Sequence, residues 1–322
     1  MKINFFLSNA TRSGGNIYDT SVLDLLNEKY QVKSHNAFTS YRSIGHSYID
    51  LLYTSITAKS ESTDIDILDY TASTSFLPRL NGKRIIIFHH FDENENNKPK
   101  KYNVLFKRFL KNAQNATVVV VSQYWKDFLH LYNLKDVKII YNSFDDKRYI
   151  ATLDKKSFLT KYNLVDKPII YIGKNSKSKS LKAFELLQQY KNEYNIVTTG
   201  KKTEFEGPLN LDLTFEDYIN LLYFSSCTVL LTDFKEGWSR IAHESILCNT
   251  PVIGNGSGGM SELLKMAKQI QQNEYDSSKL HHTIRSIIQT NVRVPKENKE
   301  ALLGLNMLYF KESWFNLIDN KI

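Results

Sequence analysis

Short apolar runs alternate with amphipathic stretches along the whole chain. In the first half, runs rich in Ile, Val and Phe are bounded by polar turn residues and predict strands at 3–7, 65–69, 84–88, 117–121 and 138–141. Apolar residues near helical spacing predict helices at 16–29, 102–112 and 123–132. The first half is therefore expected to alternate strands with helices.

The second half repeats this alternation. It predicts strands at 169–172, 194–198, 228–232 and 251–253, and helices at 181–191, 215–224, 239–247 and 260–267. The stretch 271–300 is polar and gives no clear element, whereas 301–322 predicts one helix. Strand–helix alternation builds parallel sheets with helices on both faces, so we expect an α/β protein of two doubly wound, Rossmann-like domains. A polar region at 145–167, followed by Pro168, marks the expected boundary.

Composition adds limits to this picture. Among 322 residues, 42% are hydrophobic and 24% are charged, which is ordinary for a globular protein and excludes a disordered, collagen-like or disulfide-scaffold chain. No apolar run approaches the 18 or so residues of a membrane-spanning helix. The N-terminal apolar run at 3–7 is too short for a signal-peptide core, so we expect no export. Cys227 and Cys248 lack metal-ligand spacing and indicate reduced thiols in a cytoplasmic protein.

The net charge of +8 favours anionic partners such as nucleotides, nucleic acid or a membrane surface. One basic segment, 98–111, carries Lys98, Lys100, Lys101, Lys107, Arg108 and Lys111 without an acid between them. With its aromatic residues, this segment could lie on an anionic membrane and bring the protein to a lipid-linked partner. The alternative is a helix that packs its aromatic side chains into the first domain and leaves a solvated basic face.

The densest chemical signal lies between residues 228 and 264. Glu236 precedes a Gly-Trp-Ser turn, and Glu244 lies about one and a half turns into the helix that follows, with Ser239 as a plausible N-cap. A second Gly-rich turn at 254–259 precedes another helix. Helix N-termini carry partial positive charge and unpaired N–H groups, which suit a phosphate. An ordinary strand–turn–helix unit would show similar glycines, so this physical signal alone leaves both interpretations open.

This segment resembles the signature of family 4 retaining glycosyltransferases of the GT-B fold. The family's two glutamates, its "PVI" and its "GG-x-x-E" correspond to Glu236, Glu244, the "PVI" at 251–253 and the stretch 258–262. Asn249 and Thr250 replace the Gly that usually precedes "PVI", which is a mild departure that touches only the turn.

The resemblance extends over nearly the whole chain. Lys174 and Lys179 take the family's two basic positions, with Ser180 where Gly is usual. The further matches are Gly14 and Gly15 in an N-terminal glycine loop, Ser122 after a strand, Asn142 and Asp145 before the linker, and Trp314 in the aromatic C-terminal helix. Ser143 replaces the family's Gly in that pre-linker segment.

The resemblance implies a GT-B architecture: two Rossmann-like domains facing a cleft, and a C-terminal helix that crosses back to the first domain. We therefore expect an acceptor-side domain at 1–150, a nucleotide-sugar-binding domain at 151–300 and a returning helix at 301–322. Transfer from a nucleotide-sugar must stabilise a departing diphosphate, which lysines and a helix dipole can do without a metal.

The resemblance also implies residue roles. Glu236 is expected beside the transferred sugar, where it supports charge at the anomeric centre, and Glu244 at the ribose hydroxyls. His89 and His90 follow the strand 84–88, and the family often has a histidine there that contacts the donor; we favour His89 as the second catalytic residue. The expected donor-binding set is Lys174, Lys179, Gly237, Trp238, Ser239, Arg240, Glu244 and Gly15. Gly14 and His90 are assigned to the acceptor side. A loop histidine or a plain glycine turn without a ligand is the alternative.

The pair Asp64 and Asp66 matches the Asp-x-Asp metal motif of the other large glycosyltransferase fold. The alternation around Ile65 and Ile67 favours a strand, so we expect no metal and no cofactor beyond the nucleotide-sugar substrate.

The sequence thus predicts a cytoplasmic, retaining glycosyltransferase, peripheral on the inner membrane face if the basic segment binds lipid. Its acceptor would be a glycan or a lipid-linked molecule in surface polysaccharide or glycoconjugate assembly. The alternatives are an epimerase or phosphorylase on the same fold, a nucleic-acid-directed, base-modifying glycosyltransferase and a non-catalytic GT-B partner protein. No nucleic-acid reader motif is recognisable, so nucleic acid is not the expected partner.

Overall fold

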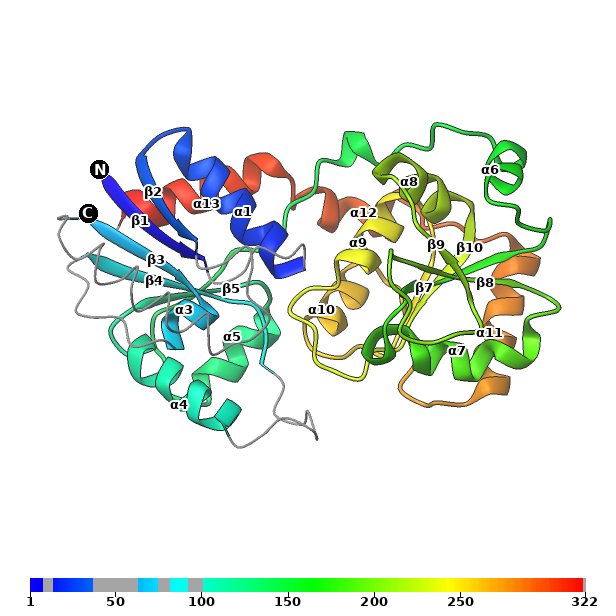
Figure 1. Cartoon of the computed structure of the whole chain (residues 1–322), viewed down its shortest axis with the longest axis horizontal. Coiled ribbons are helices and arrows are strands. Elements are labelled where there is room, and N and C mark those ends of the chain that lie inside the picture. Colours follow the sequence, from blue (N-terminus) through cyan, green and yellow to red (C-terminus); the bar gives the residue numbers. More distant parts are fainter. Residues whose placement is uncertain (8–13, 37–62, 75–81, 92–100, 321–322) are drawn as a thin grey trace. The chain divides into compact units, whose positions relative to one another are not determined.

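The computed structural model describes residues 1–7, 14–36, 63–74, 82–91 and 101–320 (Figure 1). The chain divides into two compact units. Unit 1 comprises Met1–Asn142 together with Met307–Ile322, and unit 2 comprises Ser143–Asn306. The divisions, after Asn142 and after Asn306, lie slightly before and slightly after the boundaries expected at residues 150 and 300.

Unit 1 is built on a parallel sheet with the order β2-β1-β3-β4-β5-β6. The strands are β1 (Lys2–Leu7), β2 (Gln31–Asn36), β3 (Ile65–Asp69), β4 (Lys83–Phe88), β5 (Thr117–Val120) and β6 (Val137–Ile139). The helices are α1 (Gly14–Asn27), α3 (Tyr70–Thr74), α4 (Lys101–Ala113), α5 (Gln123–His130) and α13 (Met307–Asp319). In Figure 1, α1 and α13 lie on one side of the sheet, and α3, α4 and α5 lie on the other.

Buried aromatic side chains join both layers of helices to this sheet. On one side, the rings of Phe88 and Phe109 stack with centroids 4.9 Å apart, and Trp125 meets Phe88 edge-on at 5.5 Å. On the other side, Trp314 of α13 is fully buried, and the Tyr18 ring lies edge-on to it at 6.4 Å. The last helix is therefore part of the core of unit 1.

Unit 2 contains a second parallel sheet, in the order β12-β11-β10-β7-β8-β9. Its strands are β7 (Ile169–Lys174), β8 (Asn195–Thr199), β9 (Leu209–Leu211), β10 (Ser225–Leu230), β11 (Val252–Gly254) and β12 (Ile270–Gln271). Its α-helices are α6 (Lys155–Lys161), α7 (Lys182–Leu187), α8 (Phe215–Phe224), α9 (Arg240–Leu247), α10 (Gly259–Met266), α11 (Ser277–Thr290) and α12 (Lys296–Leu303). Short 3₁₀ or π turns are η1 (Asp146–Arg148), η2 (Lys177–Leu181) and η3 (Gln188–Tyr190).

Side-chain caps explain where several of these helices begin. Asp154, Thr214 and Asp276 each accept a backbone N–H from the first turn of α6, α8 and α11, respectively. Asn291 ends α11 in the left-handed conformation, with φ of 47°. Ion pairs and hydrogen bonds then fasten the segment after the first unit boundary to α8.

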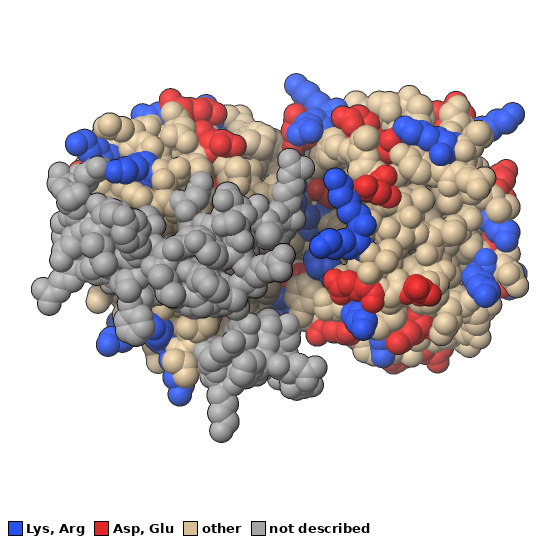
Figure 2. Space-filling model, viewed as in Figure 1, with Lys and Arg blue, Asp and Glu red and all other residues tan. Residues whose placement is uncertain are grey.

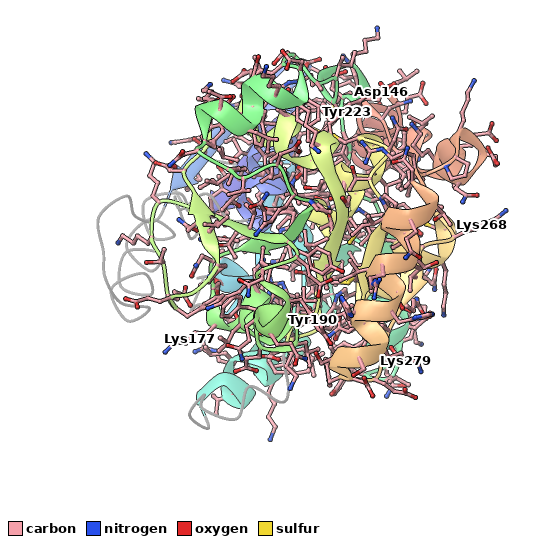
Figure 3. All side chains as sticks on the ribbon, turned by 90° about the vertical axis from the view of Figure 1, so that its right-hand side faces the viewer. Asp146, Lys177, Tyr190, Tyr223, Lys268 and Lys279 are labelled. Carbon is pink, nitrogen blue, oxygen red and sulfur yellow. The ribbon has the colours of Figure 1, made fainter. Side chains whose placement is uncertain are left out.

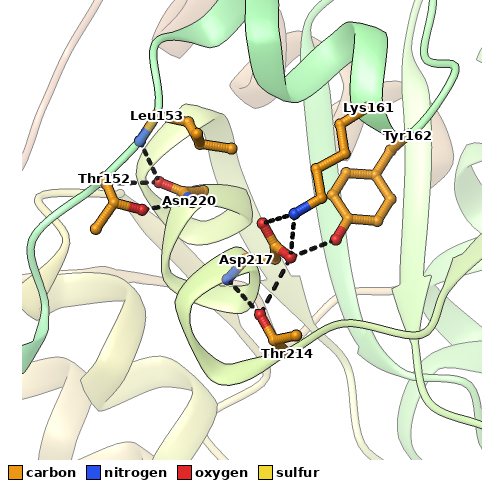
Figure 4. Close-up of polar contacts among 7 residues, drawn as sticks. All are labelled: Thr152, Leu153, Lys161, Tyr162, Thr214, Asp217 and Asn220. Carbon is orange, nitrogen blue, oxygen red and sulfur yellow. Dashed lines mark hydrogen bonds and ion pairs between the residues drawn. The ribbon is translucent and has the colours of Figure 1, made fainter.

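Figure 4 shows this attachment. Asp217 of α8 accepts hydrogen bonds from Lys161 and from the Tyr162 hydroxyl, the latter at 2.6 Å. One turn further, the Asn220 side chain accepts from the backbone N–H of Thr152 at 2.8 Å. The segment 152–162 is thus held along one helix of unit 2.

Two expectations about elements were wrong in detail. The helix predicted at 181–191 begins earlier, with the π turn η2 at Lys177, and ends in the 3₁₀ turn η3. The single helix predicted at 301–322 is interrupted after Leu303 and resumes as α13 at Met307. The predicted α/β class with two doubly wound parallel sheets is confirmed.

On the face in Figure 2, basic and acidic side chains of unit 2 are interspersed.

Candidate active site

The strand order of unit 2 reverses between β7 and β10, which is the position where open α/β sheets bind ligands, outside the carboxyl ends of the strands. Lys174 is the last residue of β7 and is exposed. Lys179 lies in η2, directly after β7, and Glu236 lies in the loop after β10. Three residues singled out from the sequence therefore lie at the carboxyl edge of the sheet.

Lys179 and Glu236 form a loose ion pair. The Lys179 Nζ lies 3.8 Å from Glu236 Oε1 and 5.5 Å from the centroid of the Phe234 ring. The backbone N–H of Asp233 donates to the Ser178 carbonyl at 2.9 Å, which ties the loop after β10 to η2. At 3.8 Å the ammonium is beyond normal hydrogen-bond distance from the carboxylate, so it keeps donors for an anionic ligand.

Gly258 holds the backbone of Glu236 in place. The two residues pair as an isolated parallel bridge, and the Gly259 N–H donates to the Glu236 carbonyl at 2.8 Å. Gly258 has φ of +66°, and a Cβ there would lie 2.4 Å from the Glu236 carbonyl oxygen. Only glycine fits this conformation so close to the Glu236 backbone. The Gly-Gly turn therefore positions the glutamate by close backbone contact.

The Gly237–Ser239 turn is buried and leads into α9. The Trp238 Nε1–H donates to Nδ1 of His243 at 3.2 Å. Burial, and to a lesser degree the charge of Arg240, lowers the pKa of His243 to about 3, so the imidazole stays neutral and can accept that bond. Ser239 takes the predicted N-cap position, but its side chain makes no capping hydrogen bond. The buried tryptophan is therefore anchored within the turn.

Glu244 is buried and surrounded by hydrogen-bond donors. The Tyr218 hydroxyl donates to Oε2 at 2.7 Å, while Arg240 Nη2 and the Tyr149 hydroxyl lie 3.3 and 3.4 Å from Oε1. Burial, reinforced by the Glu244 charge, raises the pKa of Tyr218 well above its usual range. The same two causes raise the pKa of Tyr149. Both phenols therefore remain protonated and act as donors.

In unit 1, the strand order reverses between β1 and β3. The sequence suggested that Gly14 and Gly15 lie in a loop. This was wrong, because α1 begins at Gly14 and both glycines belong to its first turn. A Cβ at Gly15 would lie 3.0 Å from His89 Cδ2, so the missing side chain lets the imidazole approach the helix. His89 follows β4 and is half-buried, whereas His90 is exposed.

His89 is paired with a buried carboxylate. Its Nε2 lies 2.9 Å from Asp19 Oδ1, and Tyr18 packs edge-on against its ring at 5.3 Å. Burial by itself lowers the pKa of His89, but the charge and hydrogen bond of Asp19, together with the charge of Asp69, outweigh it and raise that pKa. This site therefore holds an imidazole that is protonated more readily than in water.

Three residues that complete these contacts were not predicted from the sequence: Asp19, Tyr149 and Tyr218. Asp19 follows a buried tyrosine in an amphipathic helix, and a lone Asp at such a position gives no sign of a functional role. The tyrosines lie in segments without a motif. Only the partner residue in the fold reveals their role.

The Asp-x-Asp pair has a structural role. Asp66 is fully buried in β3, where it accepts hydrogen bonds from Asn4, Thr63 and the Gly82 N–H at 3.0–3.1 Å. Burial raises the pKa of Asp66, although these donors oppose the shift. Asp64 accepts from the Lys2 N–H at 2.8 Å. Within the described residues, no group of three or more His, Cys, Asp or Glu side chains could hold a metal ion.

The basic segment coincides with α4. Lys98 and Lys100 lie outside the described residues, as does the side chain of Lys101. Lys107 and Lys111 are exposed, Arg108 is half-buried, and the Phe106 and Phe109 rings are buried in the core of unit 1. Within the described part of the chain, no helix is both long and apolar enough to span a membrane.

The chain was compared with known proteins. No protein-family model and no curated protein matches it. Solved structures do match. The sucrose-phosphate synthase of Thermosynechococcus elongatus is 13% identical, with a TM-score of 0.81 and coverage of 99% of this chain and 98% of that one.

Two further matches also cover nearly the whole chain. Anabaena Alr3699/HepE in complex with UDP-glucose is 15% identical, with a TM-score of 0.78 over 99% of this chain and 100% of that one. WaaG, a glycosyltransferase involved in lipopolysaccharide biosynthesis, is 12% identical, with a TM-score of 0.76 over 98% of this chain and 99% of that one. At these identities the matches show the fold, which is GT-B, as predicted.

Proposed function

We propose that the protein is a glycosyltransferase that takes its sugar from a nucleotide-sugar bound by unit 2. The observation that carries this proposal is the ion pair of Lys179 with Glu236 at the carboxyl edge between β7 and β10, the switch point of the sheet, where Lys174 ends β7. Glu244 lies further along in α9, in the same strand–turn–helix unit. Anabaena Alr3699/HepE was solved with UDP and with UDP-glucose, which makes uridine diphosphate the first class of donor to test.

Each residue has a task in this reaction. Lys174 and Lys179 bind the diphosphate, and a charge-assisted hydrogen bond of this kind contributes about 1.5–3 kcal/mol. Glu244 accepts a hydrogen bond from the ribose. Glu236 lies beside the transferred sugar, held by Gly258, and stabilises positive charge that develops at the anomeric carbon.

We further propose retention of configuration, without a metal. The acceptor hydroxyl oxygen forms the new bond to the anomeric carbon while the bond from that carbon to the diphosphate oxygen breaks. The hydroxyl proton passes to the departing diphosphate. No enzyme nucleophile is assigned. Two lysines supply the positive charge that the leaving diphosphate needs.

We assign the acceptor to unit 1, beside Gly14 and His90, with Gly15 and His89 on the donor side, and propose a glycan or lipid-linked molecule in surface polysaccharide or glycoconjugate assembly. The reaction would take place in the cytoplasm, at the inner face of the membrane if the basic segment binds lipid. The raised pKa of His89 supports a role in binding an anionic or hydroxyl-rich group, since its protonated form donates hydrogen bonds.

A thermal-shift panel with UDP-, GDP-, ADP- and dTDP-sugars in EDTA tests the donor site. Saturation at 100 times the dissociation constant should add about 2.7 kcal/mol of stability. One nucleotide class should shift the wild type and lose its effect in Glu244→Ala and Lys174→Ala. Lys177→Ala is the matched control, because Lys177 is exposed on the neighbouring turn and extends outward from the surface (Figure 3). Absence of any shift in the wild type would contradict the proposal.

A further inference from the structure

The imidazole of His89 is enclosed by residues of α1. Its Nε2 lies 2.9 Å from Asp19 Oδ1, and the Tyr18 ring stands edge-on to it, with centroids 5.3 Å apart. A Cβ at Gly15 would lie 3.0 Å from His89 Cδ2, so the ring fits against bare backbone there. Three residues of one helix therefore define where the imidazole lies.

The two ring nitrogens of His89 have different surroundings. A carboxylate only accepts hydrogen bonds, so Nε2 carries a proton in the pair with Asp19. No described residue forms a hydrogen bond with Nδ1, and 17% of the side chain is exposed. The pair therefore leaves Nδ1 as the ring nitrogen that meets a ligand. The charges of Asp19 and Asp69 outweigh burial and raise the pKa of His89, which agrees with a firm pair.

Tyr18 is itself fixed by the last helix of the chain. The rings of Phe310 and Trp314 in α13 lie edge-on to the Tyr18 ring at 5.2 and 6.4 Å. The Tyr18 hydroxyl donates to the Ile140 carbonyl, just after β6, at 2.9 Å. Burial raises the pKa of Tyr18 well above its usual range, so the phenol remains protonated and keeps this bond. The Tyr18 side chain thus contacts α13 and His89 at the same time.

These contacts form a chain from α13 to the imidazole. Among the described residues, no hydrogen bond or ring contact joins α13 to His89 directly, so the helix acts on the imidazole through Tyr18. Tyr18 and Asp19 are consecutive residues of α1, which lies beside α13 on the same side of the sheet (Figure 1). A shift of the Tyr18 backbone therefore also shifts the carboxylate that holds Nε2.

We propose that α13 positions His89 for its ligand, with Tyr18 and Asp19 as the positioning residues. Docking of α13 fixes Tyr18, and Tyr18 and Asp19 together hold the ring with Nδ1 presented after β4, at the carboxyl edge of the unit 1 sheet. The last helix then serves the site as well as the core. The inference rests on the proposed function only in taking the ligand of His89 to be a substrate of the transfer.

NMR of the full-length protein without ligand tests the positioning directly. Nitrogen shifts of labelled histidine report which ring nitrogen carries the proton, and His89→Gln assigns the signal. In the wild type, the neutral ring should carry its proton on Nε2. In Phe310→Ala, a measurable share should move to Nδ1 and the pKa of His89 should fall, because the pair with Asp19 loosens. Asp19→Ala gives the reference signal of a ring that is not held.

Ile318→Ala is the matched control. It truncates another fully buried side chain of α13, near the end where Asp319 accepts a hydrogen bond from Tyr30, beyond the last turn of α1. It should destabilise unit 1 in urea, as Phe310→Ala does, and leave the His89 signal as in the wild type. Phe310→Leu, which loses the ring contact but stays apolar, replaces Phe310→Ala if that variant does not fold. A wild-type His89 signal in the Phe310 variant, or equal changes in it and the control, would overturn the inference.

Kinetics separate this inference from the proposed function. Nucleotide release from the donor that the thermal-shift panel identifies should slow on the order of tenfold or more in Phe310→Leu, because a misplaced group costs rate, and should stay near wild type in Ile318→Ala. The thermal shift by nucleotide, a property of unit 2, should persist in both variants. If no nucleotide-sugar binds the wild type, the proposed function fails and the NMR result still decides the positioning. An unchanged rate beside a loosened ring would sink this inference alone.

Discussion

The candidate residues of the two units are held in different ways. In unit 2, close backbone contact fixes Glu236 against Gly258, and hydrogen bonds from Arg240 and two tyrosines fix Glu244. In unit 1, the imidazole of His89 pairs with the Asp19 carboxylate and packs against the Tyr18 ring and the backbone at Gly15. The first arrangement depends on shape and on permanent donors, whereas the second depends on the protonation of one ring.

This difference suggests a division of labour. A site for a nucleotide-sugar benefits from a rigid frame, because binding energy then goes into orienting the reacting carbon. A site that contains a titrating histidine changes its charge, and with it its binding properties, as the pH changes. We therefore expect shape-changing substitutions to act on unit 2 and pH to act on unit 1, and the following predictions test that expectation.

The largest effect is expected in the core of unit 1. Trp314→Ala removes a fully buried side chain and should destabilise unit 1 by about 3–5 kcal/mol, measured by urea unfolding followed with circular dichroism. Leu308→Ala, at a position that is 63% exposed on the same helix, should change stability by less than about 0.5 kcal/mol. Stabilisation of unit 2 by nucleotide should persist in both variants; its loss in Trp314→Ala would show that the units do not behave separately.

The next effect should fall on the frame around Glu236. In Gly258→Ala, the backbone at φ of 66° and ψ of −138°, a conformation that almost only glycine adopts, should alone cost about 1–3 kcal/mol. The new Cβ would also lie 2.4 Å from the Glu236 carbonyl oxygen and push it away. Nucleotide-sugar binding should therefore be lost in a thermal-shift measurement. Gly256→Ala has a similar φ of +62°, but its Cβ would meet only the flexible Gln271 side chain, at 3.3 Å. Binding that survives in Gly258→Ala, or disappears equally in both variants, would argue against the frame.

A smaller, pH-dependent effect is expected in unit 1. Because the folded-state pKa of His89 is raised above its unfolded value of about 6.5, the pair with Asp19 stabilises the protein fully below that pH. The stabilisation is lost as the pH rises through the folded-state pKa. Asp19→Asn should therefore lower stability more at pH 5.5 than at pH 9, and should lower the pKa of His89 measured by NMR.

His281→Gln in unit 2 is the control for this prediction, because its histidine faces a half-exposed carboxylate, Glu193, at 3.3 Å. It should leave the pH dependence of unit 1 unchanged. An Asp19→Asn variant with the same pH profile as the wild type would remove the proposed distinction between the units.

The smallest effect concerns the exposed lysines of α4. If the helix contacts an anionic membrane, changing Lys107 and Lys111 to Glu should reduce flotation with anionic vesicles, since each lysine contributes about 1 kcal/mol near such a surface. Lys268→Glu, on an exposed turn of unit 2, is the control. Unchanged flotation of the α4 variant would contradict the membrane contact and leave a solvated basic face.

The strongly apolar strands and the Glu-to-Glu segment could be predicted because their signals are local. The strand β2 was missed, since QVKSHN is polar and becomes a strand only by pairing with β1 at the edge of the sheet. The helix α11 was missed because only Leu280, Ile284 and Ile287 are buried among polar residues. The tyrosine donors of Glu244 could not be predicted either, since α8 and α9 bring Tyr218 and the carboxylate together only in three dimensions.

The return of α13 to unit 1 affects how the protein is made. The ribosome delivers all of unit 2 before it delivers Met307–Asp319, so the first unit to begin synthesis is the last whose core can close. Until then, the surface around Tyr18 lacks Phe310 and Trp314, which cover it in the finished structure. Domains generally fold in the order of synthesis, and here that order is reversed for the final packing step. A stalled or shortened chain would therefore contain a complete unit 2 attached to an open, aggregation-prone unit 1.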